Sequence, residues 1–210
     1  MVGWAIIGQV TTTKKAAPPS ERRTHLIRLA ADLFAEKGFR ATTVREIADA
    51  AGILSGSLYH HFDSKESIGD EILRGFLDDV LGGYREAVAG VDDPRAAIER
   101  MVRFSTAALS RHRAALTMLQ NDWAYFSAQK RFAYLRTAMK EIEQTWLDQL
   151  ERGKQDGQFR PDLDARLAYR LLRDILWIPT SWKQARGKSW STDEIVDGLL
   201  RLLFDGIIAR

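Results

Sequence analysis

Thr42–Lys65, TTVREIADAAGILSGSLYHHFDSK, decides the fold of this 210-residue chain, because it holds two short helical patterns separated by a turn. In the first pattern, Val44, Ile47 and Ala48 recur at the i, i+3, i+4 spacing of one apolar helical face. Gly52 follows at the turn, where a residue without a Cβ tolerates a positive φ. A small alanine at the contact and a glycine at the turn let two helices cross closely. The stretch therefore predicts a helix-turn-helix.

The ends of these two helices carry signals of their own. Thr43 and Glu46 have the spacing of a capping box, in which two side chains bond each other's backbone amides at a helix start. The second helix is expected to begin at Ser55. It would expose a small, hydrogen-bonding surface that suits the DNA major groove, made of Ser55, Gly56, Ser57, Tyr59 and His60. An ordinary helical hairpin without a DNA role is the alternative.

The composition is that of an ordinary globular protein, with 45% hydrophobic and 28% charged residues. The absence of cysteine excludes disulfides, thiolate metal sites and a cysteine nucleophile, and agrees with a reducing cytoplasm. A net charge of +3 is by itself weak evidence for nucleic-acid binding, because one domain can be basic while another is neutral. No apolar run approaches the ~18 residues of a membrane span, so no membrane partner is expected.

The pattern stays helical on both sides of the motif. A first amphipathic helix begins at Ser20 and ends at Gly38, and Ser64 caps a long fourth helix. Gly82 and Gly83 are expected to weaken or kink that fourth helix. The predicted parts are a disordered tail at 1–19, a DNA-binding domain at 20–66 and an effector-binding and dimerisation domain at 67–210.

The rest of the chain is predicted to be all-α, with about nine helices in total and no β-alternation or phosphate-binding glycine loop. The start and stop signals are Asp93-Pro94, a break at 111–113, a helix of about 114–122, a cap at Asp162 or its neighbour, an end or kink at Pro179, and a capping box from Ser191 to Glu194.

The last helix is apolar on more than one side, from position 195 to 208. A surface helix needs only a single apolar stripe, so a second cover is required. A second copy of the chain is the expected cover. We therefore predict a homodimer in which the last two helices of each subunit form a four-helix interface.

Residues 29–68, LAADLFAEKGFRATTVREIADAAGILSGSLYHHFDSKESI, resemble the DNA-binding domain of the TetR family of bacterial repressors. The resemblance implies a dimer that binds a palindromic double-stranded operator and is released by a small effector. Carried over position by position, the DNA-facing candidates are Thr43, Arg45, Ser55, Gly56, Ser57, Tyr59, His60 and Lys65. Tyr59, His60 and Lys65 would mostly hold phosphate, while Arg45 and the segment 55–57 are better candidates for base edges.

A narrower resemblance extends into the remainder, through DEILRGFLD and GQFRPDLD. These stretches are similar to the actinobacterial TetR repressors of cholesterol and steroid-ring catabolism, whose effectors are CoA thioesters. The resemblance implies that Arg173 and Trp177, on the helix after RPDLD, contact such a ligand.

The residues around Arg173 give a partly independent view. Tyr169, Arg173 and Trp177 share one helical face, and Asp174 is expected to pair with Arg170. An arginine between two aromatic rings suits an anionic, planar ligand such as a CoA thioester. On the residues alone, a salt bridge or a cation–π contact is favoured over ligand binding. The resemblance reverses that preference.

Further aromatic residues are numerous enough to line a pocket, although core packing is the alternative for each. The ligand-binding candidates are Arg173, Trp177, Tyr169, Phe104, Trp123, Phe126 and Trp146. No resident cofactor is expected, only the effector.

Enzymatic interpretations fit poorly. Ser57, His60 and Asp63 lie on consecutive turns of one short segment, which cannot place a nucleophile, a base and an orienting acid. Four scattered histidines without cysteine do not predict a metal site. We expect a repressor and no enzyme.

Two alternatives stay open. One is a TetR-type regulator of efflux or stress genes that binds a neutral or cationic drug, which an acidic residue such as Asp122 facing the pocket would favour. The other is a helical acyl-CoA-binding protein without a DNA-binding role.

Overall fold

The computed structural model describes residues 21–177 and 191–207. These ranges contain nine α-helices, one 3₁₀ helix and no strand, which confirms the all-α prediction. The predicted tail at 1–19 and the predicted helix end at Pro179 lie outside them. In chain order the helices are α1 (Glu21–Lys37), α2 (Val44–Ala50), α3 (Ser55–Leu58), α4 (Lys65–Val88), α5 (Pro94–Arg111), α6 (Arg113–Ser127), η1 (Lys130–Phe132), α7 (Tyr134–Gln155), α8 (Ala165–Trp177) and α9 (Thr192–Ile207).

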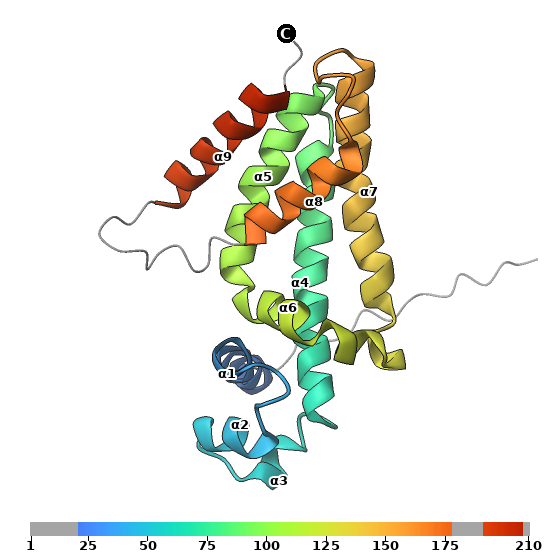
Figure 1. Ribbon diagram of the computed structural model, residues 1–210. Helices are drawn as coiled ribbons and strands as arrows, with labels where there is room; N and C mark the ends of the chain where they lie inside the picture. The colour runs from blue at the N-terminus through green and yellow to red at the C-terminus, as the bar shows by residue number, and fades with distance from the viewer. Residues whose placement is uncertain (1–20, 178–190, 208–210) are drawn as a thin grey trace, which may run out of the picture.

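The helices form an elongated molecule with a small unit at one end (Figure 1). Helices α1 to α3 make this unit, and α3 lies at its tip, far from α8 and α9. The long helix α4 starts beside the small unit and runs up into the larger bundle, where it packs against α5 and α7. One continuous helix therefore belongs to both parts of the molecule.

The small unit is built on the apolar face of α1. Leu26, Ala30 and Phe34 are fully buried there and pack with Ile47 of α2 and Leu58 of α3. Burying an aliphatic or aromatic side chain of this size stabilises a fold by about 1.5–3 kcal/mol. This contact fixes how α2 and α3 cross.

Local chemistry sets the helix ends as the sequence predicts. The side chain of Thr43 accepts from the amide of Glu46 at 3.2 Å, and the carboxylate of Glu46 accepts from the amide of Thr43 at 2.8 Å. Gly52 takes a φ of +64° at the turn, and Ser64 caps α4. These predictions are confirmed.

The predicted kink at Gly82 and Gly83 is wrong, because α4 continues as one helix to Val88. The ring of Phe104 on α5 lies against Gly83, where an added Cβ would come within 2.0 Å of it. Gly83 therefore allows two helices to approach closely instead of bending one of them.

The break between α5 and α6 falls at His112, as predicted. The Nε2 of His112 lies 2.9 Å from the Asp79 carboxylate. This contact ties the junction of α5 and α6 to α4. Helix α6 extends further than the predicted 114–122 and reaches Ser127. Asp122 has non-helical angles within it (φ −121°, ψ 19°), so an irregular turn separates the two halves of α6.

The last two helices begin at side-chain caps. Asp164, two residues after the predicted Asp162, accepts from the amides of residues 166 and 167 at 2.9 and 3.0 Å. Asp162 instead pairs with Arg160. Ser191 and Glu194 form the predicted capping box of α9.

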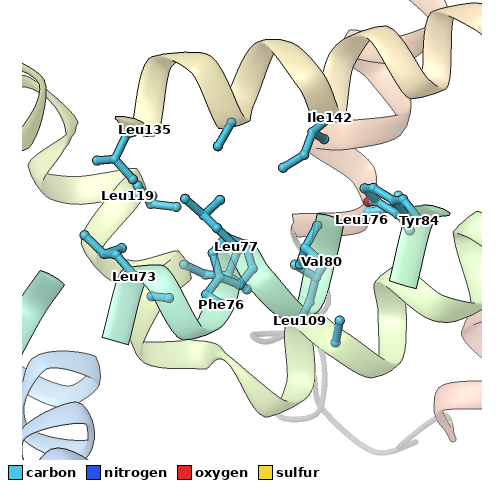
Figure 2. Packing of buried hydrophobic residues seen from close by; sticks show 14 of the residues in the cluster. Leu73, Phe76, Leu77, Val80, Tyr84, Leu109, Leu119, Leu135, Ile142 and Leu176 are labelled. Atoms are coloured by element: carbon cyan, nitrogen blue, oxygen red, sulfur yellow. The ribbon is translucent and has the colours of Figure 1, made fainter. Parts of the chain in front are cut away.

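The core of the bundle lies between α4, α5, α6 and α7, and is closed by α8. Figure 2 shows side chains from these helices turned toward one another, with Leu73, Phe76, Leu77 and Val80 following one side of α4. Several of the same residues line a cavity within the bundle.

Candidate functional site

The surface of the helix-turn-helix is small, polar and accessible. Tyr59 is 55% exposed, His60 and Gly56 are exposed, and Ser55 and Ser57 are half-buried. Helix α3 ends at Leu58, and a turn continues the chain, in which the amides of residues 61 and 62 bond the Leu58 carbonyl at 2.9 and 3.0 Å. The predicted candidates of this segment are thus brought to one end of the molecule.

The two candidates before α3 differ in how free their side chains are. Arg45 is exposed and lies 3.8 Å from Asp49, a weak surface pair that leaves the guanidinium available. The hydroxyl of Thr43 is engaged in the capping box. Bonds from Lys37 and Thr43 lower the pKa of the Glu46 carboxyl to about 2, which keeps the cap ionised and intact.

Lys65 has a structural role that the sequence did not indicate. Its Nζ donates to the carbonyls of Phe39 and Thr42 at 2.9 and 2.8 Å, and lies 4.6 Å from the centre of the Phe39 ring. Burial lowers the pKa of this amine. The ammonium thus ties the start of α4 to the segment between α1 and α2, and the phosphate contact stays a prediction.

The larger bundle contains a cavity of about 410 Å³. Its walls come from α4, α5, α6, α7 and α8, and include the predicted residues Trp123, Trp146, Tyr169 and Arg173. Further lining residues, labelled in Figure 2, are Phe76, Val80, Tyr84, Leu109, Leu119, Ile142 and Leu176. Most of this wall is apolar.

One buried polar pair interrupts the apolar wall. The hydroxyl of Tyr84 lies 2.8 Å from that of Ser105, which itself donates to the Met101 carbonyl at 2.6 Å. Tyr84 is therefore the donor of the pair. Burial raises the pKa of Tyr84, and it raises that of Tyr169 to about 12. Both phenols are neutral at ordinary pH and place no charge in the cavity.

Charged side chains also line the cavity, contributed by α7 and α8. Arg173 pairs with Asp174 at 2.8 Å, so the expected pairing of Asp174 with Arg170 is wrong. Neighbouring residues on a helix point apart, but the long guanidinium side chain reaches back to the adjacent carboxylate. No ion pair involves Arg170 within the described residues, and Glu143 supplies a carboxylate from α7.

Two predicted ligand residues, Phe104 and Phe126, do not line this cavity. Phe104 packs against Gly83 and the Tyr84 ring, whose centre is 5.6 Å away. Phe126 is fully buried, and the centre of its ring lies 4.8 Å from the ring centres of Phe39 and Phe132. It therefore packs beside the small unit. Trp177 ends α8, and its side chain lies outside the described part of the chain.

Asp122, the acidic residue considered for a pocket wall, also lies elsewhere. It is 9% exposed at the irregular turn of α6, whereas Glu143 and Asp174 are the acids that line the cavity. The sequence did not indicate that Glu143 and Arg170 line the cavity. Their positions on the helical faces of α7 and α8 would have identified them only once the packing of these helices was known.

Helix α6 connects the cavity to the small unit. Its first half contributes Leu119, and Trp123 follows directly after the irregular turn. Its second half contributes Tyr125, which donates to the Glu66 carboxylate of α4 at 2.6 Å, and Phe126, which packs on Phe39. Helix α6 therefore contacts both the cavity and the base of α4.

A second apolar surface covers α8 and α9. Leu167, Leu171, Ile175 and Leu202 are 55%, 56%, 37% and 71% exposed and border one shallow groove. An exposed apolar patch of this kind is typical of a protein–protein interface.

Residues 21–177 and 191–207 contain no group of three or more potential metal ligands. No helix among them is long and apolar enough to cross a membrane.

Comparison with known proteins agrees with this geometry. Residues 26–72 match the family model of bacterial regulatory proteins of the tetR family, and residues 91–207 match the tetracyclin repressor-like C-terminal domain. The HTH-type transcriptional repressor KstR2 of Rhodococcus jostii is 50% identical over 90% of this chain and 92% of its own.

Solved structures give the same result. The ketosteroid transcriptional regulator KstR2 of Mycobacterium tuberculosis superposes with a TM-score of 0.85 at 40% identity, over 93% of this chain and 99% of that one. AibR, solved with isovaleryl coenzyme A and operator DNA, has a TM-score of 0.77 at 20% identity, over 88% and 98% of the two chains. At that identity AibR shows the fold alone.

Proposed function

Because this chain belongs to the TetR family of bacterial regulatory proteins and is a transcriptional repressor, we propose that it binds its operator as a homodimer and leaves it when an acyl-CoA thioester fills the cavity. We further propose that the acyl group comes from steroid breakdown, since relatives at 40–50% identity are named KstR2 and one is described as a ketosteroid regulator. In this proposal the chain acts by binding and catalyses no reaction.

The observation that carries the effector proposal is the cavity itself. An apolar interior suits a hydrocarbon acyl group, while Arg170 and Arg173 suit the phosphates of CoA. The pair of Arg173 with Asp174 is half-exposed and contributes little, so a phosphate can displace the carboxylate.

The same proposal assigns the two ends of the molecule. Residues 20–66 form the DNA-binding domain, and residues 67–210 bind effector and partner. Helix α3 of each protomer enters the major groove, and the two copies lie about 34–36 Å apart on a palindromic operator. Tyr59 and His60 hold phosphate, while Arg45 and the segment 55–57 face base edges.

Release requires only a modest energetic coupling. If the effector favours the arrangement that does not bind DNA by about 1.4 kcal/mol, operator affinity falls tenfold. Helices α4 and α6 are the elements able to carry this change, because both border the cavity and the small unit.

The effector is tested with a duplex from upstream of the chain's own gene in a band-shift titration. A steroid-acid CoA thioester is expected to weaken the complex, while free CoA and the free acid do so less because each lacks one half of the ligand. Arg173→Ala should lower thioester affinity about tenfold or more. Arg166→Ala, on an exposed arginine of α8 that does not line the cavity, is the matched control. The effector proposal fails if no thioester weakens the complex.

DNA docking has a separate test. Tyr59→Ala is expected to weaken binding to all duplexes alike, since a phosphate contact carries no sequence information. Unchanged affinity would show that α3 is not at the DNA.

Glu143 supports one competing effector class. A carboxylate on the cavity wall suits a cationic hydrophobic compound, as in regulators of efflux. Cationic dyes in the same titration separate the two classes: release by dyes, abolished in Glu143→Gln, would favour the efflux regulator.

A further inference from the structure

Leu54 is the most exposed large apolar residue of the described chain, with 81% of its surface accessible. It occupies the cap position of α3 with extended backbone angles, and its carbonyl accepts from the Ser57 amide at 2.9 Å. Its side chain makes no capping bond and does not pack on the core. The backbone of Leu54 therefore starts the helix, while the fold makes no use of its side chain.

The other exposed aliphatic residues lie elsewhere. Leu167, Leu171, Ile175 and Leu202 gather on α8 and α9, at the far end of the molecule from α3 (Figure 1). A partner subunit seated on α8 and α9 would leave Leu54 in solvent. Only a partner that approaches the tip of the small unit can cover Leu54.

The neighbours of Leu54 describe what that cover is. Ser55, Gly56 and Ser57 are short, and space is open above Gly56, where an added Cβ would touch nothing within 4 Å. Leu54 thus projects from a low, polar surface. In helix-turn-helix proteins the first residues of the second helix face the edges of bases in the major groove.

A leucine side chain neither donates nor accepts a hydrogen bond, so it cannot read most base edges. The one apolar feature in the major groove is the C5-methyl group of thymine. We propose that Leu54 is a specificity-determining residue that selects thymine through this methyl group, once in each operator half-site. The proposal rests on the docking of α3 in the major groove.

The test removes that methyl group alone. A duplex is selected from a random pool by the full-length protein, and each thymine is then replaced by deoxyuridine, singly and in symmetric pairs. At one position per half-site, the wild type should lose about fourfold in affinity, and about fifteenfold for the pair. Leu54→Ser should bind the thymine and uracil duplexes alike. Leu54→Met, which keeps an apolar side chain, should retain the preference.

Two internal controls accompany the test. Uracil at the remaining thymines should leave all three proteins unaffected. The midpoint of thermal unfolding should be no lower for Leu54→Ser than for wild type, since the leucine side chain is exposed and serine is favoured at the cap of a helix.

The results separate this inference from the docking that it rests on. If no duplex is selected, both are overturned. If a duplex is selected but no thymine is methyl-sensitive, or if Leu54→Ser loses the same factor as wild type on every uracil duplex, only the role of Leu54 is overturned.

Discussion

Gly82 and Gly83 are neighbours in α4 with opposite surroundings. Space is open at Gly82, while the position of a Cβ on Gly83 is occupied by the ring of Phe104. Both are glycines in a helix interior, where the residue type alone costs about 0.5–1 kcal/mol relative to alanine. The packing around each residue therefore decides what a substitution does.

Gly83→Ala should lower the free energy of unfolding by about 1–3 kcal/mol, because the Phe104 ring has to leave its place against α4 and Tyr84. Gly82→Ala should raise it by about 0.5–1 kcal/mol through helix propensity. Urea denaturation of the two variants measures both. Equal effects of the same sign would contradict the close approach of α4 and α5 at Gly83.

Lys65 is bonded to backbone carbonyls in the fold and is also predicted to contact DNA phosphate. Lys65→Met should lower the free energy of unfolding by about 1–3 kcal/mol, because the buried carbonyls of Phe39 and Thr42 lose their donor. Lys37→Met, which removes an exposed lysine, is the control and should change stability little. If Lys65 serves only phosphate, stability stays the same and the salt dependence of DNA binding weakens by about one counterion.

At the scale of elements, the sequence predicted what local chemistry determines. The capping boxes at Thr43 and Ser191 and the break at His112 depend on a few adjacent residues and are confirmed. The irregular turn at Asp122 has no such local signal. It lies where α6 passes from the cavity to the small unit.

The ligand cavity was predicted only in part, for the same reason. Trp123, Trp146, Tyr169 and Arg173 line it, whereas Phe104 and Phe126 face other parts of the core. All are aromatic or amphipathic residues in helices. Which of them faces the cavity depends on how five helices rotate against one another, and no periodicity in one chain specifies that rotation.

Helix α6 supplies the element-scale prediction. Tyr125→Phe removes the bond to Glu66 but keeps the ring against Phe39. An active thioester should then bind with similar affinity to the free protein, while its effect on operator affinity falls about three- to tenfold. The measurement is operator affinity with and without saturating thioester.

Tyr134→Phe is the matched variant, because Tyr134 of α7 bonds Asp70 one turn further along α4 at 2.8 Å. If Tyr134→Phe reduces the effect of the thioester and Tyr125→Phe does not, the signal passes through α7 and not through α6.

At the scale of the whole molecule, the two proposed binding surfaces lie at opposite ends. Helix α3 forms one tip, and α8 and α9, which carry the exposed apolar residues, lie toward the other end (Figure 1). A dimer formed through α8 and α9 would leave both copies of α3 free to reach successive grooves. Helix α4 spans most of the distance between the ends. In the proposed dimer, a small change at the cavity would therefore alter the separation of the two copies of α3.

The dimer itself is the last prediction. Leu171→Asp places a charge in the exposed apolar face of α8 without disturbing the core, because Leu171 is 56% exposed. Sedimentation should give a monomer, and the operator complex should weaken by orders of magnitude, since one α3 makes only half of the contacts. Arg166→Asp, on another face of α8, should stay dimeric. A dimeric Leu171→Asp protein would mean that the subunits meet through a different surface. A monomer with full operator affinity would instead mean that one copy is sufficient for DNA binding.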